Sequence, residues 1–256
     1  MAKRNPVLVF SPGAWHTPDF FEPTTSLLCE TGYTCDLASL PSVGAELRSP
    51  PQVPQNFDAD VAALRETITK NLDASRDVIL LVHSYNGIVG SEAVEGLDRA
   101  SRSRAGKSTA VTHLIYIAAL ILDIGTRLWP TGQPKFPDQV VVKGDLVYRV
   151  PEKLDEVFYG NCNEEQREFV VRSLRSQARG VFTDSEVRHT AWRFVPSTYI
   201  RARDDPLVDF MKDPPRGHRF AEVLEVEGDH FPFVSAAEET AEVIKGVVER
   251  SVKDGE

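Results

Sequence analysis

Short runs of apolar, often β-branched residues alternate along this chain with segments of helical spacing, and this alternation restricts the fold more than any other feature. The strand-like runs are residues 7–10, 78–83, 112–122, 197–202 and 221–226. Helical spacing recurs in residues 57–72, 88–102 and 236–252. Buried strands that alternate with helices predict an α/β fold with a mostly parallel sheet and helices on both of its faces.

The helix predicted for residues 57–72 illustrates the pattern. Its apolar stripe consists of Val61, Leu64, Ile68 and Leu72. Asp58 and Asp60 stand in its first turn, where negative side chains complement the helix dipole.

Residues 123–189 interrupt the alternation of strands and helices. Helical spacing is found there in residues 151–159 and 163–178, and strand character resumes only at Ser197. An interval of this length is too long for an ordinary connection between two strands. We therefore expect a helical lid over residues 123–189, inserted before the late strands of a core that comprises residues 1–122 and 190–256.

The charge distribution excludes several classes of partner. The formal net charge is −9, and the basic surface that nucleic acids or anionic membranes require is missing. No apolar run approaches a membrane span of about 20 residues, and no secretory signal is found. The three cysteines, Cys29, Cys35 and Cys162, form no CxxC motif. These features predict a cytoplasmic protein.

Residues 77–90 contain the pattern with the clearest chemical meaning. A buried strand passes through His83-Ser84-Tyr85-Asn86-Gly87 directly into a helix. Such a turn holds its serine above the carboxyl ends of the strands, where open α/β sheets bind ligands. The amides of the following helix point to the same place and stabilise developing negative charge. Ser84 is thus a candidate nucleophile; a helix-capping serine is the alternative.

This segment resembles the nucleophile elbow of α/β-hydrolases. The chain is most similar to compact cap-bearing esterases and hydroxynitrile lyases, typified by plant methylesterases, and among them to fungal and bacterial proteins with a His-Ser-Tyr-Gly-Gly elbow. It departs from the usual Gly-x-Ser-x-Gly pattern at Val82 and at Asn86. At the second of these positions, asparagine accepts strained backbone angles better than most residues do.

A second motif, Phe10-Ser11-Pro12-Gly13-Ala14-Trp15-His16, follows the first strand. The resemblance implies an oxyanion hole here, formed by the backbone N–H groups of Ala14 and Tyr85. Pro12 replaces the histidine that is common in the family. Trp15 and His16 are expected to contact substrate, and a Pro-Gly turn without catalytic meaning is the alternative.

A third motif is Val226-Glu227-Gly228-Asp229-His230-Phe231. His230 lies between the last strand and the last helix, where the family keeps its catalytic base, and imidazole can accept and return a proton near neutral pH. The acid that orients it is expected to be Asp205, which gives the chain order Ser84, Asp205, His230. Asp204 and Asp123 remain alternatives, and Asp229 is expected to shape the loop.

Together these motifs predict a serine hydrolase that cleaves a small, largely apolar ester, lactone or related acyl compound through an acyl-enzyme. Two alternatives stay open: a lyase or cyclase of natural-product biosynthesis on the same fold, and a ligand-binding protein with vestigial catalysis. Tyr85 is expected to line the pocket. His113, His189 and His218 share no ligand spacing, so we expect no metal and no cofactor. A homodimer is possible.

Overall fold

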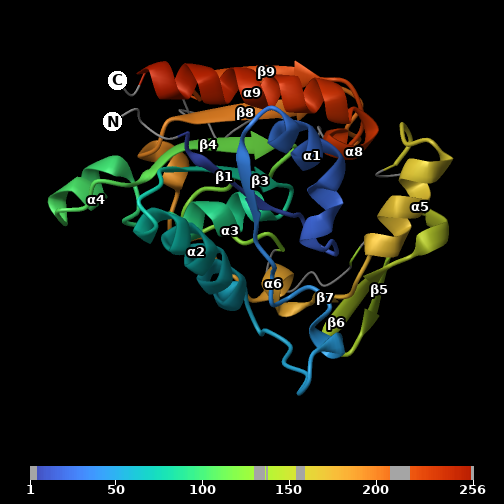
Figure 1. Ribbon diagram of the computed structural model, residues 1–256. Coiled ribbons are helices and arrows are strands. Elements are labelled where there is room, and N and C mark those ends of the chain that lie inside the picture. The colour runs from blue at the N-terminus through green and yellow to red at the C-terminus, as the bar shows by residue number, and fades with distance from the viewer. Residues whose placement is uncertain (1–4, 130–135, 137, 154–158, 208–219, 255–256) are drawn as a thin grey trace.

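A six-stranded parallel sheet forms the centre of the computed structural model, which describes residues 5–129, 136, 138–153, 159–207 and 220–254. Its strands are β1 (Val7–Ser11), β2 (Thr34–Leu37), β3 (Val78–His83), β4 (Val111–Ile117), β8 (Ser197–Ala202) and β9 (Glu222–Val226). They are arranged in the order β2-β1-β3-β4-β8-β9, and every neighbouring pair is parallel (Figure 1). The predicted α/β architecture is confirmed.

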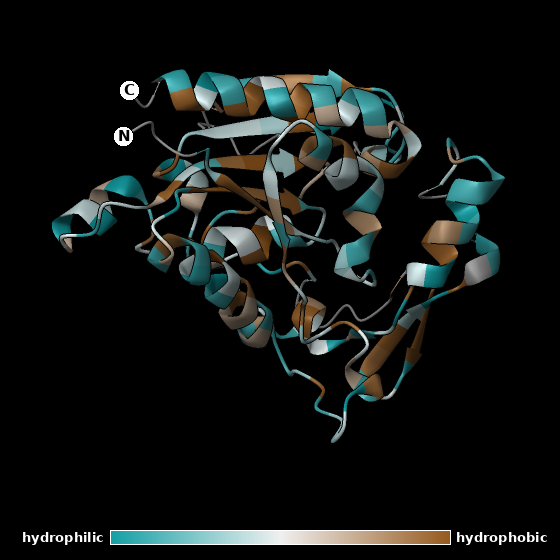
Figure 2. Cartoon of the chain, viewed as in Figure 1, coloured by the Kyte–Doolittle hydropathy of each residue, from teal (hydrophilic) through white to brown (hydrophobic). Residues whose placement is uncertain are grey.

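Helices cover both faces of this sheet, as predicted. The helices on one face are α1 (Glu22–Glu30), α8 (Pro232–Ser235) and α9 (Ala237–Asp254), and those on the other are α2 (Asp58–Asp73) and α3 (Asn86–Ala93) (Figure 1). Alternate strand residues enter separate cores, so that Leu8 packs with α1 and α9 while Val9 packs with α2 and α3. Strands at the centre of the sheet are coloured mainly as apolar, whereas polar and apolar residues alternate along helices such as α9 (Figure 2).

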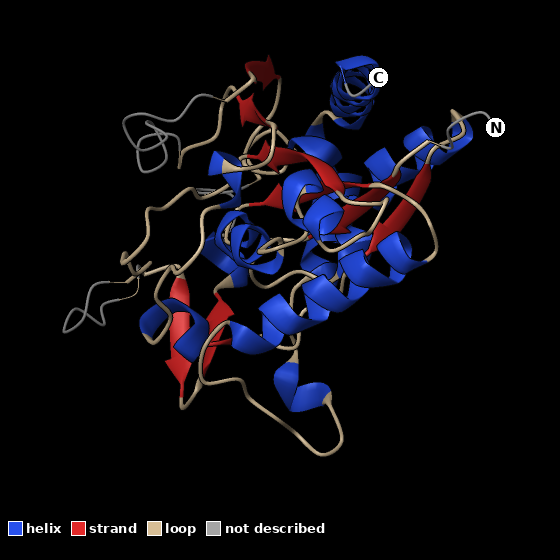
Figure 3. Ribbon diagram, turned by 90° about the vertical axis from the view of Figure 1, so that its left-hand side faces the viewer, coloured by secondary structure: helices blue, strands red, loops and turns tan. Residues whose placement is uncertain are grey.

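Residues 123–189 differ from the expected helical lid. They include a three-stranded antiparallel sheet and two short α-helices, set off from the central sheet in both ribbon views (Figures 1 and 3). The strands are β5 (Val140–Lys143), β6 (Leu146–Arg149) and β7 (Gln177–Ala178), and the helices are α5 (Glu164–Ser173) and α6 (Gly180–Thr183). A 3-10 turn occupies Pro151–Lys153, and 154–158 lie outside the described residues.

The helix predicted for residues 163–178 ends early for a clear reason. Asn163 and Gln166 form a capping box at its start, but Leu174 adopts an extended conformation with ψ 136°. From there the backbone bonds to other segments: Arg175 N–H donates to Trp15 O, and Ala178 N–H donates to Ser42 O. Pairing with distant segments therefore overrides the local helical spacing.

Two further predictions are corrected. The strand at 112–122 ends at Ile117, because Ala118 takes a left-handed φ of 43° and the chain turns toward the elbow. The helix at 88–102 is two helices, α3 and α4 (Arg99–Arg104); Gly96 (φ 71°) interrupts it and Asp98 caps the second part. Strand β2 was not predicted, and neither was α1. Short 3-10 turns occur at Pro18–Phe21, Ala45–Leu47 and Ala191–Arg193.

Small residues permit the close crossing of β3, α3 and the segment after β4. A Cβ added to Gly87 would lie 2.1 Å from the backbone oxygen of Leu120, and one added to Gly90 would lie 2.5 Å from Cγ1 of Val82. Val82 stands where the elbow pattern has its first glycine. The side chain of Val82 is accommodated because Gly90 leaves the space above it.

We expect Gly87→Ala to lower the free energy of unfolding by more than about 2 kcal/mol, because the methyl group meets backbone that cannot rotate away. Gly246→Ala in α9 is the matched control, since its methyl group meets only the flexible end of Arg250, at 3.2 Å. That change should be neutral or stabilising by about 0.5–1 kcal/mol. Denaturant unfolding of both variants measures these changes in stability. Equal unfolding midpoints for the two variants would contradict the predicted difference.

Candidate active site

Ser84 occupies the sharp turn between β3 and α3. Its φ is 52°, a left-handed conformation that is rare for residues other than glycine. The carbonyl of Ser84 accepts hydrogen bonds from Gly87 N–H at 3.0 Å and from Leu120 N–H at 2.9 Å. These two bonds hold the strained backbone, and Ser84 remains partly exposed.

His230 lies against Ser84 although the two are far apart in sequence. Its Nε2 is 2.9 Å from Ser84 Oγ, and its ring is 2 % exposed. The preceding Gly228 has φ 101°, which only glycine adopts without strain, and turns the chain after β9. His83 donates from Nε2 to the carbonyl of His230 at 2.9 Å. The residue before the serine thus holds the backbone of the histidine.

Asp205 is the acid that the structure brings to His230. Its Oδ2 is 2.9 Å from Nδ1 of His230, and the residue is 4 % exposed. An ionised carboxylate only accepts hydrogen bonds, so Nδ1 carries the proton and Nε2 is left as an acceptor for the Ser84 hydroxyl.

The two alternative acids lie elsewhere. Asp204 is exposed and accepts a hydrogen bond from Asn161 Nδ2 at 2.7 Å. Asp123 follows the end of β4 and forms an ion pair with Arg193 at 2.8 Å. Of the three candidate acids, Asp205 is the one with a hydrogen bond to the His230 ring.

Asp229 organises the loop around His230, as expected. Its Oδ1 accepts from Phe231 N–H at 3.0 Å and from Ser235 Oγ at 3.2 Å, and its Oδ2 accepts from Asn161 N–H at 3.1 Å. Burial raises the pKa of this carboxyl, although these bonds act in the opposite direction. The bonds join the His230 loop to residue 161 of the inserted segment.

The loop after β1 passes directly beside Ser84. A Cβ on Gly13 would lie 2.6 Å from Nδ1 of His83 and 3.0 Å from Cβ of Ser84, so the approach requires glycine. In the described part of the chain, the backbone N–H groups of Ala14 and Tyr85 donate to no protein acceptor. Both are therefore free to bind an oxygen that develops negative charge.

Asn86 and Pro12, two of the three departures from the family pattern, contact each other. Asn86 Nδ2 donates a hydrogen bond to the carbonyl of Pro12, and Asn86 is fully buried. Asn86 thus ties the start of α3 to the loop after β1. A glycine at this position could not make that bond.

His16 is engaged within the protein. The residue is 3 % exposed; its Nδ1 is 2.7 Å from Ala14 O and its Nε2 is 2.9 Å from the hydroxyl of Tyr159. Burial lowers the pKa of His16 to about 3, so the ring is neutral at physiological pH. A neutral ring that donates from Nδ1 to a carbonyl must accept at Nε2, and the Tyr159 hydroxyl is the donor.

The ring of Tyr85 does not line an open pocket, contrary to expectation. It is 2 % exposed, packs edge-on against Phe182 at 5.7 Å and donates its hydroxyl to Asp60 Oδ2 at 3.0 Å. Burial raises the pKa of Asp60, although the bonds from Ser42 and Tyr85 lower it.

Asp60 was interpreted from the sequence as a dipole-complementing residue, and its burial was missed. A signal was present: Asp60 stands four residues before Leu64, which is itself four residues before Ile68, so the carboxylate shares the buried stripe of the helix.

Comparison with known proteins identifies the family. The model of the alpha/beta hydrolase family matches residues 8–243. The chain belongs to the alpha/beta hydrolase family. A relative from Aspergillus novofumigatus (strain IBT 16806), the alpha/beta hydrolase nvfD, is 27% identical over 254 residues, which are 97% of this chain and 98% of that protein.

Solved structures of two esterases and of a methylketone synthase share the fold. Polyneuridine aldehyde esterase superimposes with a TM-score of 0.73 at 16% identity, covering 95% of this chain and 99% of that one. A methylesterase from Arabidopsis superimposes with a TM-score of 0.71 at 20% identity and the same coverage. Tomato methylketone synthase I complexed with 2-tridecanone gives 0.72 at 17% identity, covering 97% and 99%. At these identities the likeness is one of fold.

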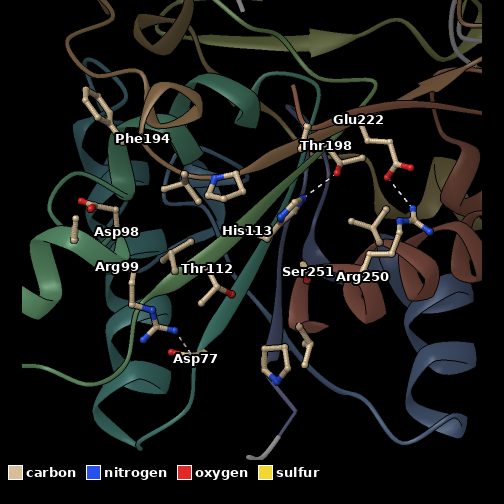
Figure 4. Close-up of a pocket in the computed structure, with 18 of the residues that line it drawn as sticks. Asp77, Asp98, Arg99, Thr112, His113, Phe194, Thr198, Glu222, Arg250 and Ser251 are labelled. Atoms are coloured by element: carbon tan, nitrogen blue, oxygen red, sulfur yellow. Dashed lines mark hydrogen bonds and ion pairs between the residues drawn. The ribbon is translucent and has the colours of Figure 1, made fainter. Parts of the chain in front are cut away.

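A cavity of about 1190 Å³ lies at the opposite edge of this alpha/beta hydrolase, by the amino ends of the strands (Figure 4). Arg99 pairs there with Asp77, and Arg250 pairs with Glu222, each at 2.7 Å. His113 contacts Thr198 Oγ1 at 2.9 Å. Because Ser84 is not part of its lining, this cavity is separate from the candidate active site.

No cluster of His, Cys, Asp and Glu suited to a metal ion occurs among the described residues; His218 lies outside them. None of the described helices combines the length and the apolar character that crossing a membrane requires.

The buried neutral His16 makes the stability of this hydrolase sensitive to acid. An unfolded histidine takes up a proton near pH 6.5, whereas His16 in the folded protein resists protonation down to about pH 3. The unfolded state therefore binds more protons in this window, and stability falls as the pH falls. We expect His16 to account for a loss of about 2 kcal/mol between pH 8 and pH 5.

Denaturant unfolding of the wild type and of His16→Asn at several pH values measures this term. The variant keeps a donor for Ala14 O but cannot titrate, so its stability should fall less steeply between pH 8 and pH 5. The raised pKa values of the Asp60 and Asp229 carboxyls act in the opposite direction, because they favour the folded state as the pH falls. Both groups are present in the wild type and in the variant, so their effect does not contribute to the difference between the two. If stability fell equally steeply with pH in the wild type and in His16→Asn, this pH dependence could not be assigned to His16.

Proposed function

We propose that this chain is a serine hydrolase that cleaves a small, largely apolar ester, lactone or related acyl compound through an acyl-enzyme. The observation that carries the proposal is the continuous hydrogen-bond chain from Ser84 Oγ through His230 to Asp205, with 2.9 Å at each step. A strained serine at a strand–helix turn, a buried imidazole and a buried carboxylate are the parts that acyl transfer requires.

The proposed reaction begins with attack of Ser84 Oγ on the substrate carbonyl while its proton passes to Nε2 of His230. Asp205 holds the ring with Nε2 toward the serine and stabilises the positive charge that the ring gains. The imidazolium then returns the proton to the departing alcohol, which leaves an acyl-enzyme. Water deprotonated by the same nitrogen releases the acid and restores the serine.

The oxyanion of each tetrahedral intermediate would lie between the backbone N–H groups of Ala14 and Tyr85. Ala14 belongs to the loop that passes beside Ser84, and Tyr85 directly follows Ser84 at the start of α3; neither N–H bonds to a described protein acceptor. Donors that are already oriented need no rearrangement when charge develops, which makes such a pair effective.

Aromatic side chains near the serine and the loop after β1 favour an apolar substrate. Phe231 lies edge-on to His230 with 5.0 Å between ring centroids, and Phe182 stacks on Trp15 at 5.2 Å. Apolar walls with a few polar anchors are typical of sites for small organic ligands. Phe182 comes from residues 123–189, and we propose that this segment covers the site as a lid.

Labelling with a fluorophosphonate probe, followed by mapping of the modified peptide, tests the proposal without knowledge of the substrate. We expect stoichiometric modification of Ser84 in the wild type, slow labelling in His230→Ala and none in Ser84→Ala. Ser91→Ala is a control, because the Ser91 hydroxyl is buried against Tyr116 and lies outside the site. It should label at the wild-type rate.

Turnover of p-nitrophenyl esters by the same variants separates the alternatives. Turnover that is lost in Ser84→Ala and His230→Ala supports the hydrolase. A wild type that fails to label and to turn over esters, yet binds ligands as well as both variants do, would favour a binding protein. Conversion of a natural intermediate that survives Ser84→Ala would favour a lyase or cyclase.

A further inference from the structure

The loop that carries Ala14 is held by residues of the inserted segment. Trp15, the next residue, has a left-handed φ of 67°. Its backbone N–H donates to Gln177 Oε1 at 3.0 Å, its carbonyl accepts from Arg175 N–H at 2.8 Å, and its indole Nε1 donates to Val147 O at 3.2 Å. All three hydrogen-bonding groups of Trp15 are therefore bound by residues between 123 and 189. Strained backbone persists where its surroundings hold it in this way.

Gln177 continues from Trp15 into the core. While its Oε1 accepts from Trp15, its Nε2 donates to Ser42 Oγ at 2.5 Å. The amide orientation is determined, because a flipped amide would point its NH₂ group at the Trp15 N–H. Gln177 is fully buried, and its backbone pairs with Val43 in an isolated bridge.

The chain of bonds then reaches the other side of Ser84. Ser42 donates its hydroxyl to Asp60 Oδ2 at 2.5 Å and its N–H to Oδ1 at 2.9 Å. The Tyr85 hydroxyl donates to the same Oδ2 at 3.0 Å. Hydrogen bonds from Ser42 and from Tyr85 thus meet at the buried carboxylate of Asp60. Charge-assisted hydrogen bonds in a dry interior are strong and well oriented.

We propose that Gln177 and Asp60 are positioning residues that hold the two oxyanion-binding amides in register, through the continuous chain Trp15–Gln177–Ser42–Asp60–Tyr85. The inference rests on the proposed function, since it assigns the Ala14 and Tyr85 amides to the oxyanion. It makes β7 a part of the catalytic framework: the segment that covers the site also fixes the loop that bears one of the two donors.

The test uses Gln177→Met and Tyr85→Phe, which break the chain at its two ends and keep side-chain size. The number of competent sites is first counted by complete fluorophosphonate labelling, and kcat is expressed per labelled site. Interactions with an oxyanion act in the transition state, so we expect kcat per site to fall about 10- to 100-fold while KM changes little.

The double variant tests whether the two ends are coupled. If the amides are held relative to each other through one chain, breaking a second link adds little, and the double variant should lose no more than about twice the larger single loss. Losses that multiply in the double variant would mean that the two amides are held independently, and would overturn the proposal.

Ser185→Ala is the matched control for a purely structural effect. Ser185 Oγ accepts a hydrogen bond from Phe57 N–H at 3.0 Å, so it too joins residues 123–189 to the start of α2, but it lies outside the chain of bonds. We expect reduced stability with unchanged kcat per site. If Gln177→Met and Tyr85→Phe also lose only stability or labelled sites, the positioning role is refuted. Full activity of Ser84→Ala would instead refute the proposed function.

Discussion

Ser84→Ala is expected to lower kcat for ester hydrolysis by about 10⁴-fold or more, with a small change in KM. The Ser84 hydroxyl lies 2.9 Å from Nε2 of His230 and is the group that would form the acyl-enzyme. Its removal leaves the amides of Ala14 and Tyr85, which in the proposed mechanism would still stabilise charge, so we expect a residual rate above that of water. Active-site titration and steady-state kinetics measure the loss.

His230→Ala should cost about as much as Ser84→Ala, and the double variant should be no worse than either single one. The serine and its base act as one unit, so their effects do not add. A His230→Ala variant that retains more than about a tenth of wild-type kcat would contradict the role of the imidazole. Circular dichroism and thermal unfolding establish that the variants are folded before their rates are compared.

The inner strands of the central sheet were predictable because β1, β3, β4 and β8 are buried on both faces. Residues 78–82, for example, are all apolar, and burial of this kind leaves a pattern that does not depend on distant residues. The edge strand β2 escaped prediction for the opposite reason, because its residues Thr34–Leu37 are only partly buried and include polar side chains.

Residues 123–189 could not be predicted to the same depth. Gln177 lies within a helical pattern, yet its backbone pairs with Val43 and its side chain bonds to Ser42, more than 130 positions earlier in the chain. Contacts over such separations are decided by tertiary packing rather than by local propensity.

The residues of the candidate site also differ in whether the sequence alone identifies them. Ser84 and His230 stand in local motifs, a strand–turn–helix and a loop before the last helix, and these motifs can be read one at a time. Asp60 and Gln177 belong to no motif. Their significance arises only when the fold brings α2, β7 and the loop after β1 around one buried hydrogen-bond chain.

Asp205→Asn distinguishes among the three candidate acids. The asparagine keeps the shape of the side chain but can present an N–H group to His230 Nδ1, which then has to accept. The imidazole then adopts the tautomer in which Nε2 carries the proton. In that tautomer Nε2 can no longer accept the proton of Ser84. We expect kcat to fall by about 10⁴-fold while the overall fold is preserved.

Asp204→Asn is the matched control, because it makes the same chemical change one residue earlier. Asp204 is exposed and contacts Asn161, so its replacement should change kcat by less than about threefold. Asp123→Asn, which disrupts an exposed ion pair with Arg193, should behave likewise. Steady-state kinetics on all three variants check the assignment. If Asp204→Asn or Asp123→Asn lost activity while Asp205→Asn kept it, the Ser84–His230–Asp205 arrangement would not be the one that reacts.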